Sequence, residues 1–309
     1  MFTAKDVKDL REKTGCGMMD CKKALTESNG DMEKAIDFLR EKGLAAVEKK
    51  AGRIAAEGIV DSYVNDDCTV GVLIEVNSET DFVAKNDEFK TFVATLAKIV
   101  ADSNPADVDA LKALKYPESE LTVEEMLREK ILTIGENMNI RRFAQVSEEN
   151  GFVASYKHMG GKICVLVDVE TDVVNDAVKE MARNLAMQIA AMNPRYTSNA
   201  EVSADYIAHE KEILLAQIMN DPKESQKPEK VIQGMIMGRI NKEMKEICLL
   251  DQVYVKAEDG KQSVAKYVEE VAKANGAKIT IKGFVRYETG DGLEKKNEDF
   301  AAEVAAQLG

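Results

Sequence analysis

Two β-hairpin patterns constrain the fold of this chain more than any other feature of its sequence. In the first, an apolar run at Ile59–Tyr63 precedes the alternating run Val70–Val76. In the second, alternating runs at Phe152–Tyr156 and Ile163–Val167 flank the turn His158-Met159-Gly160-Gly161. Apolar residues at every second position predict half-buried strands, and a short polar turn between two such strands predicts antiparallel pairing.

Helical patterns follow both hairpins. Apolar residues recur at helical spacing over Phe89–Ile99, where we expect Asp87 to cap the helix, and again over Asp176–Met192. Further strands are predicted around Ile140–Phe143 and over Ile279–Tyr287. Hairpins and helices in this arrangement predict an α+β protein, with a core of two α+β subdomains that each hold an antiparallel sheet.

The remaining segments are predicted to be helical. The stretch from Thr3 to Gly43 has the pattern of three short helices, and we expect Gly43 to end the third. Two amphipathic segments, Ser203–Met219 and Glu229–Ile247, have a short polar connection and predict an antiparallel helical hairpin. The last segment, Glu298–Leu308, predicts a C-terminal amphipathic helix.

These elements divide the chain into five parts. We expect a three-helix module, two core subdomains, an inserted helical hairpin and a C-terminal module. Their predicted bounds are residues 1–52 for the three-helix module, 53–150 for the first core subdomain, 151–193 with 239–288 for the second, 194–238 for the inserted hairpin, and 289–309 for the C-terminal module.

Composition limits the partners and the chemistry. The 309 residues carry a formal net charge of −13, whereas phosphate neutralisation needs a basic footprint, so we expect no nucleic-acid ligand. No apolar run approaches the roughly 18 residues of a membrane span, and no signal sequence is evident, so we expect a cytoplasmic protein without membrane association. The five cysteines are scattered without metal-ligand spacing, which predicts reduced thiols and no bound metal.

One stretch stands out between the first hairpin and its helix, Thr80-Asp81-Phe82-Val83-Ala84-Lys85-Asn86. Binding residues are over-represented in such connections, and here an acid and an aromatic residue are adjacent. Two interpretations are open. Either Phe82 is a core residue and Asp81 an ordinary turn acid, or the two residues form a binding surface.

Three further features are also open to two interpretations. Met18 and Met19 occupy adjacent helix positions that do not easily both face a core, so we expect one to be buried and one to contact a partner. His158, at a hairpin tip, is either a solvated residue or a binding residue. The pair Arg141-Arg142 favours surface ion pairs over a phosphate contact, because no Gly-rich loop lies nearby.

No catalytic motif is evident in the sequence. It contains no P-loop, no dinucleotide-binding fingerprint that opens a helix, no HExxH and no GxSxG. The two histidines, His158 and His209, are far apart in the chain. We therefore expect a binding protein that needs no cofactor and makes no covalent bond, although these patterns do not name its partner.

Four sequence blocks resemble one known family, in that family's order and over nearly the whole chain. The family is bacterial translation elongation factor Ts, and the motifs are specific to it. The blocks are Leu10-Arg11-Glu12-Lys13-Thr14-Gly15-Cys16-Gly17-Met18-Met19-Asp20-Cys21-Lys22-Lys23-Ala24-Leu25, the stretch Thr80–Asn86, Ile134-Gly135-Glu136-Asn137 with Ile140-Arg141-Arg142, and Asp299-Phe300-Ala301-Ala302-Glu303-Val304-Ala305-Ala306.

The resemblance implies a guanine-nucleotide exchange factor that binds elongation factor Tu·GDP. Such a factor displaces Mg²⁺ and promotes GDP release, so that GTP can bind. The resemblance also implies a ubiquitin-associated-like fold for residues 1–52 and a homodimer through the helical hairpin. It assigns Mg²⁺ dislocation to Thr80, Asp81, Phe82 and Val83, and other contacts with the GTPase to Met18, Met19, Ile134, Gly135, His158 and Phe300.

Two other functions remain open at this point. The first is an adaptor whose residues 1–52 read a peptide or ubiquitin, and binding of a helix by those residues alone would favour it. The second is an enzyme that uses Asp81 with His158, which a small-molecule substrate and a bell-shaped pH–rate profile would favour.

Overall fold

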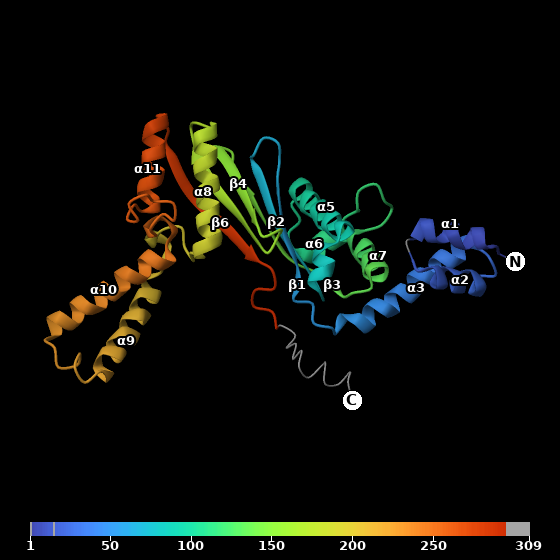
Figure 1. Cartoon of the computed structure of the whole chain (residues 1–309), viewed down its shortest axis with the longest axis horizontal. Helices are drawn as coiled ribbons and strands as arrows, with labels where there is room; N and C mark the ends of the chain where they lie inside the picture. Colours follow the sequence, from blue (N-terminus) through green and yellow to red (C-terminus); the bar gives the residue numbers. More distant parts are fainter. Residues whose placement is uncertain (1, 15, 295–309) are drawn as a thin grey trace.

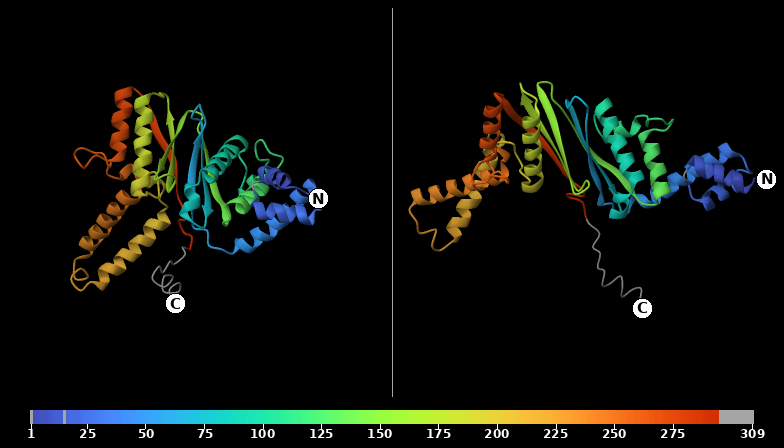
Figure 2. Two further views of the ribbon diagram at one scale, coloured as in Figure 1. Left: turned by 45° about the vertical axis from the view of Figure 1, so that its right-hand side comes forward. Right: turned by 45° about the horizontal axis from the view of Figure 1, so that its top comes forward.

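The computed structural model describes residues 2–14 and 16–294, apart from the side chains of residues 44–46 and 48. Two antiparallel sheets lie face to face between two layers of helices, with three helices at one end of the molecule and a helical hairpin at the other (Figures 1 and 2). The predicted α+β class is therefore confirmed. Phe300 and the rest of the predicted helix Glu298–Leu308 lie outside the described residues.

The first sheet has the order β1-β2-β3 and the second has the order β4-β5-β6, and every strand pair is antiparallel. Both predicted hairpins are confirmed, as β1–β2 and β4–β5. The strand bounds are β1 (Glu57–Val64), β2 (Val70–Ser78), β3 (Met138–Ser147), β4 (Gly151–His158), β5 (Ile163–Thr171) and β6 (Ile279–Glu288).

Helices cover the outer face of each sheet (Figure 1). On the first sheet lie α4 (Asp81–Lys85), α5 (Asp87–Ser103), α6 (Val108–Ala113) and α7 (Val123–Ile134). On the second lie α8 (Asp176–Met192) and α11 (Val264–Asn275). Outside the core are α1 (Ala4–Thr14), α2 (Met18–Glu27) and α3 (Met32–Ala51), and the hairpin of α9 (Ala204–Asn220) and α10 (Glu229–Ile247).

The central strand β2 is buried on both faces, not half-buried as its alternation predicts. Val72, Ile74 and Val76 pack in the core beneath α5, whereas Leu73 points to the opposite side and packs against the second sheet. The prediction of a half-buried strand was wrong because Leu73, which lies between the core-facing Val72 and Ile74, is itself apolar and buried. A strand between a helix layer and a second sheet has no solvated face.

The contact between the two sheets combines a small apolar centre with charged pairs around it. The apolar residues are Val60, Leu73, Val153, Cys164 and Leu166. Two ion pairs link the sheets or their flanking chain at the edges of this contact: Asp61 with Lys157, and Glu148 with Lys282. Within the first sheet, Glu75 pairs with Arg141 and Arg142, and it also accepts a hydrogen bond from Gly290 N of the chain after β6.

The Glu148–Lys282 pair has a second carboxyl close to it. Glu148 has a side chain that is 1% exposed and accepts hydrogen bonds from Lys282 Nζ (2.9 Å) and Asn150 N (2.7 Å). Burial raises the pKa of Glu148, but the Lys282 ammonium and the Asn150 amide more than offset this effect and lower the pKa. Burial, reinforced by Glu148, raises the pKa of the neighbouring Asp168 to about 6, with Glu170 adding to the rise and Lys282 opposing it.

Replacing Asp168 by asparagine is expected to stabilise the protein at pH 7.5 but not at about pH 3.5. Because burial raises the pKa of Asp168 from 3.8 to about 6 in the folded chain, ionisation costs stability in full above pH 6, and this cost declines as the pH falls from 6 to 3.8. The melting temperature of the variant should exceed that of wild type by about 2 °C at pH 7.5, and the difference should shrink below pH 6 and vanish at about pH 3.5. A variant that melts below wild type at both pH values would contradict this assignment.

The third helix of the module extends further than predicted, because Gly43 does not end α3. The helix continues through Gly43 to Ala51. A Cβ atom on Gly43 would lie only 2.4 Å from Leu132 Cδ1 of α7. Glycine here permits close packing of two helices instead of a helix end, and it brings the module against the core.

The predicted helical hairpin is present as α9 and α10. Ile218, Ile232, Ile236 and Ile240 form its buried contact. Helix α10 is continuous across residues 238 and 239, where the predicted domain boundary lies. The domain bounds remain predictions. None of the helices in the described part of the chain is long and apolar enough to cross a bilayer.

Candidate functional site

The stretch Thr80–Asn86 forms a short helix, α4, that the sequence patterns did not predict. Thr80 is its N-cap, and the hydroxyl of Thr80 accepts a hydrogen bond from Val83 N (3.4 Å). Asn86 ends α4 and caps α5, because its side-chain oxygen accepts from Glu88 N (2.8 Å) and Phe89 N. The prediction that Asp87 caps α5 is therefore wrong by one residue.

Two glutamates fasten the start of α4 to the loop between α7 and β3. Glu136 accepts hydrogen bonds from Thr80 Oγ1 (2.6 Å) and Thr80 N (3.0 Å). Glu79, which precedes Thr80, accepts a hydrogen bond from Asn137 N (2.6 Å). Hydrogen bonds to a charged carboxylate are stronger than neutral ones, so this loop fixes the position of α4.

Ile134 is the last residue of α7, and Gly135 is the first residue of this loop. Ile134 is half-buried and packs against the core beneath α5, whereas Gly135 is exposed. Gly135 ends α7 with φ +91°, a conformation that favours glycine, and it redirects the chain toward Glu136. Lys50 Nζ of α3 donates to the Gly135 carbonyl (2.6 Å), so this loop also contacts the three-helix module.

Alternate burial along α4 presents one large apolar side chain to solvent. Val83 and Ala84 are buried against the core, but Phe82 is 79% exposed. No other large hydrophobic side chain in the described residues is more exposed. The interpretation of Phe82 as a core residue is therefore wrong. Burying such a ring favours association with a partner.

Two charged residues of α4, Asp81 and Lys85, flank Phe82. Lys85 Nζ lies 2.6 Å from Asp81 Oδ2 and 5.9 Å from the centroid of the Phe82 ring. The hydrogen bond from Lys85 lowers the pKa of Asp81, and Lys162 lowers it further. Asp81 is thus a carboxylate at neutral pH. A carboxyl with a lowered pKa is a poor general base, which disfavours an enzyme that uses Asp81 with His158.

The tip of the β4–β5 hairpin lies against β1, the edge strand of the first sheet. Gly161 O accepts a hydrogen bond from Val60 N of β1 (2.8 Å), and Lys162 pairs with Glu57 at the start of β1 (2.7 Å). Helix α4 also packs on β1. The structure therefore brings His158, half-buried with Nδ1 3.0 Å from the Tyr156 hydroxyl, to the neighbourhood of α4.

Met18 and Met19 lie elsewhere, in α2 of the three-helix module (Figure 1). Met18 is 55% exposed and Met19 is 74% exposed. The expectation that one of them is buried is wrong. The module is small, and in α2 its core takes up only Cys21, Ala24 and Leu25, so the first turn of the helix projects beyond that core.

The paired arginines bind a carboxylate within the protein. Arg141 Nη1 and Arg142 Nε lie 3.0 Å and 2.7 Å from the oxygens of Glu75. The predicted ion pairing is confirmed, but Glu75 is fully buried, so these are not surface pairs.

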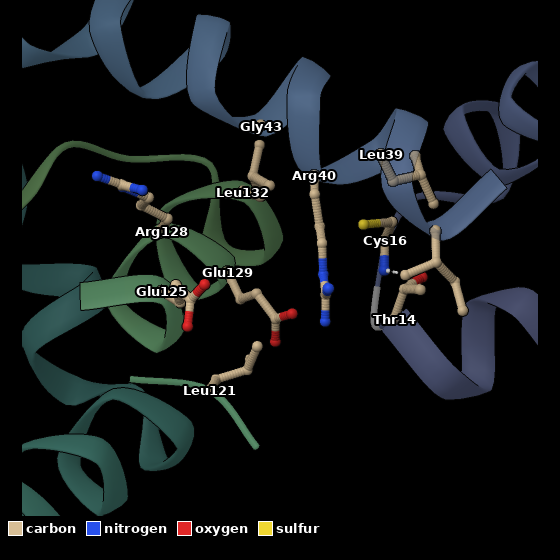
Figure 3. Close-up of a pocket in the computed structure, with 11 residues that line it drawn as sticks. Thr14, Cys16, Leu39, Arg40, Gly43, Leu121, Glu125, Arg128, Glu129 and Leu132 are labelled. Atoms are coloured by element: carbon tan, nitrogen blue, oxygen red, sulfur yellow. Dashed lines mark hydrogen bonds between the residues drawn. The ribbon is translucent and has the colours of Figure 1, made fainter. Parts of the chain in front are cut away.

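A second candidate site is a cavity of about 110 Å³ between the three-helix module and α7 (Figure 3). Arg40 extends from α3 toward Glu129 of α7, and Leu39 and Leu132 supply apolar walls (Figure 3). Burial raises the pKa of Glu129 and of the Cys16 thiol. A thiol with a raised pKa is protonated at neutral pH and is no nucleophile, so the cavity gives no support to covalent chemistry.

Comparisons with known proteins agree on one family. A model of the family described as Elongation factor TS matches residues 79–291, more than half of the chain. An elongation factor Ts of Clostridium perfringens strain 13 is 53% identical over 309 residues, all of both chains. The elongation factor Ts of Clostridium botulinum strain Eklund 17B is 51% identical over all of both chains. That of Clostridioides difficile strain 630 is 50% identical over 99% of each chain. The chain belongs to the elongation factor Ts family and is a translation elongation factor.

Proposed function

We propose that this protein is the guanine-nucleotide exchange factor of elongation factor Tu, that it acts in the cytoplasm, and that it makes no covalent bond. One observation carries the proposal: Phe82 is 79% exposed on a helix that is otherwise held firmly. Its neighbour Val83 is buried, and Thr80 is bound to Glu136. A ring on a fixed helix loses little conformational freedom when it enters a partner's pocket.

The ring and the neighbouring acid would act together on the GTPase. Phe82 inserts into an apolar pocket beside the Mg²⁺ and phosphate site of elongation factor Tu, and it shifts the elements that hold the ion. Asp81 places a negative charge next to those elements. When Mg²⁺ coordination fails, the GDP phosphates lose their largest local charge partner, and GDP leaves faster.

Thermodynamic reciprocity sets the affinity that such a factor needs. If binding of the factor lowers the affinity of the GTPase for GDP, then bound GDP lowers its affinity for the factor by the same ratio. Incoming GTP then displaces the factor in turn. Contacts spread over several parts of the chain would supply this affinity. Besides Thr80–Val83 they comprise Met18 and Met19, Ile134 and Gly135, His158 and Phe300.

The helical hairpin is proposed to join two copies of the chain. Helices α9 and α10 bury few residues against each other and leave apolar side chains on their outer faces. Scattered surface apolar residues need no partner, but several on one small hairpin favour an interface. The exposed residues are Ile213, Leu215, Met219, Val231 and Met237.

Release of fluorescent GDP from elongation factor Tu tests the proposed function directly. Stopped-flow traces with increasing amounts of the full-length protein should show acceleration that saturates as the ternary complex fills. Absence of acceleration at saturating protein would refute exchange activity. Binding of a helix or of ubiquitin by the protein, in that event, would favour the adaptor function instead.

A further inference from the structure

We infer that Met159 is a second apolar contact of the exchange site, which docks on elongation factor Tu beside Phe82. The inference rests on the proposed function and extends the site from α4 to the β4–β5 hairpin tip. Met159 lies between β4 and β5 and is 74% exposed. Its sequence position alone, in a Gly-rich turn, gave it no role.

The backbone of Met159 is the first observation that supports the inference. Met159 has φ +47°, in the left-handed region where side chains other than glycine are disfavoured. Of the six non-glycine residues with positive φ in the described part of the chain, three are asparagines, which tolerate this conformation. The other three are Cys68, Glu118 and Met159, and of these only Met159 is an exposed large hydrophobic residue.

The hairpin tip is held in place, which is the second observation. Gly161 O accepts hydrogen bonds from Val60 N (2.8 Å) and from Thr289 Oγ1 (3.0 Å). Thr289 N donates to Lys162 O (2.9 Å). The Met159 side chain therefore projects from a fixed turn, as Phe82 projects from a fixed helix.

The third observation is continuity with α4. Lys162 is close enough to Asp81 to lower its pKa, and the tip and α4 both contact β1. Phe82 and Met159 are thus two exposed apolar side chains on elements that meet at the β1 edge of the first sheet, with Asp81, Lys85 and Lys162 as charged residues of the same elements. Methionine suits such a contact because its flexible, polarizable side chain adapts to an irregular surface.

Three variants of the full-length protein test the inference. Met159→Gly relieves the disfavoured backbone and removes the side chain, whereas Met159→Leu keeps an apolar side chain of similar size. Glu118→Gly relieves positive φ at another exposed turn and serves as the matched control. For each variant we would measure the rate of fluorescent GDP release from elongation factor Tu, the affinity for nucleotide-free elongation factor Tu, and the melting temperature.

We expect Met159→Gly to bind nucleotide-free elongation factor Tu about fivefold more weakly and to need proportionately more protein for exchange. Its melting temperature should equal or exceed that of wild type, since glycine fits the backbone. Met159→Leu and Glu118→Gly should behave as wild type in binding and exchange.

If wild type accelerates GDP release and Met159→Gly matches it in affinity and exchange, the inference is overturned and the proposed function stands. The same holds if Met159→Gly weakens only self-association in sedimentation velocity. A wild-type protein that does not accelerate GDP release would instead refute the proposed function itself, and this contact with it.

Discussion

Replacing Phe82 by alanine is expected to reduce the acceleration of GDP release about thirtyfold, while the fold stays intact. A central aromatic contact of an interface contributes about 2 kcal/mol or more, which corresponds to that ratio. Because the ring is 79% exposed in the free protein, its loss should change the free energy of unfolding by no more than about 0.5 kcal/mol. Stopped-flow release of fluorescent GDP and a thermal melt measure the two effects separately.

Lys85→Ala is the matched control for this variant. It removes the ion pair with Asp81 and the cation near the ring, but it keeps Phe82 itself. Exposed ion pairs contribute little, so the expected loss of exchange is about twofold. If wild type accelerated GDP release and Phe82→Ala accelerated it equally, the exchange mechanism would have to depend on Asp81, His158 or the flanking modules.

Local sequence patterns predicted most elements of the fold because their signals are short in range. Alternation located both hairpins, and helical periodicity located α8 and α10 to the residue. The prediction failed at Gly43, where a contact with a residue distant in the sequence determines the local structure. Gly43 is typical of a helix end, yet Leu132 of α7, 89 positions further along the chain, packs where its side chain would be.

The candidate site was predicted only in part, for the same reason. The Thr80–Asn86 stretch is visible because an acid and an aromatic residue are adjacent after a strand. The hydrogen bonds that hold this stretch in place could not be predicted, since Glu136 and Thr80 are 56 positions apart and no local pattern pairs them. Lys162 and Met159 were missed as well, because only the fold brings the second hairpin to β1. The exposure of Met159 and its positive φ are visible only in the folded structure.

Glu75 holds the largest concentration of buried charge in the described core, and its removal should destabilise that core. Its carboxylate accepts hydrogen bonds from Arg141 Nη1 (3.0 Å), Arg142 Nε (2.7 Å), Asn77 Nδ2 (3.0 Å) and Gly290 N (2.8 Å). These bonds join β2 to β3 and to the chain after β6. Glu75→Gln keeps the shape of the side chain but leaves two guanidinium groups without their counter-charge.

Breaking a buried ion pair by removing one partner costs about 3–5 kcal/mol, so Glu75→Gln is expected to lower the free energy of unfolding by at least about 3 kcal/mol. A lower urea midpoint with an unchanged slope would report this loss. Hydrogen exchange at Gly290 N should accelerate as well, because its acceptor loses its charge. The matched control is Glu120→Gln, whose carboxylate is 94% exposed in its pair with Lys115 and should contribute little. Equal midpoints for the two variants would mean that solvent, not Glu75, balances Arg141 and Arg142.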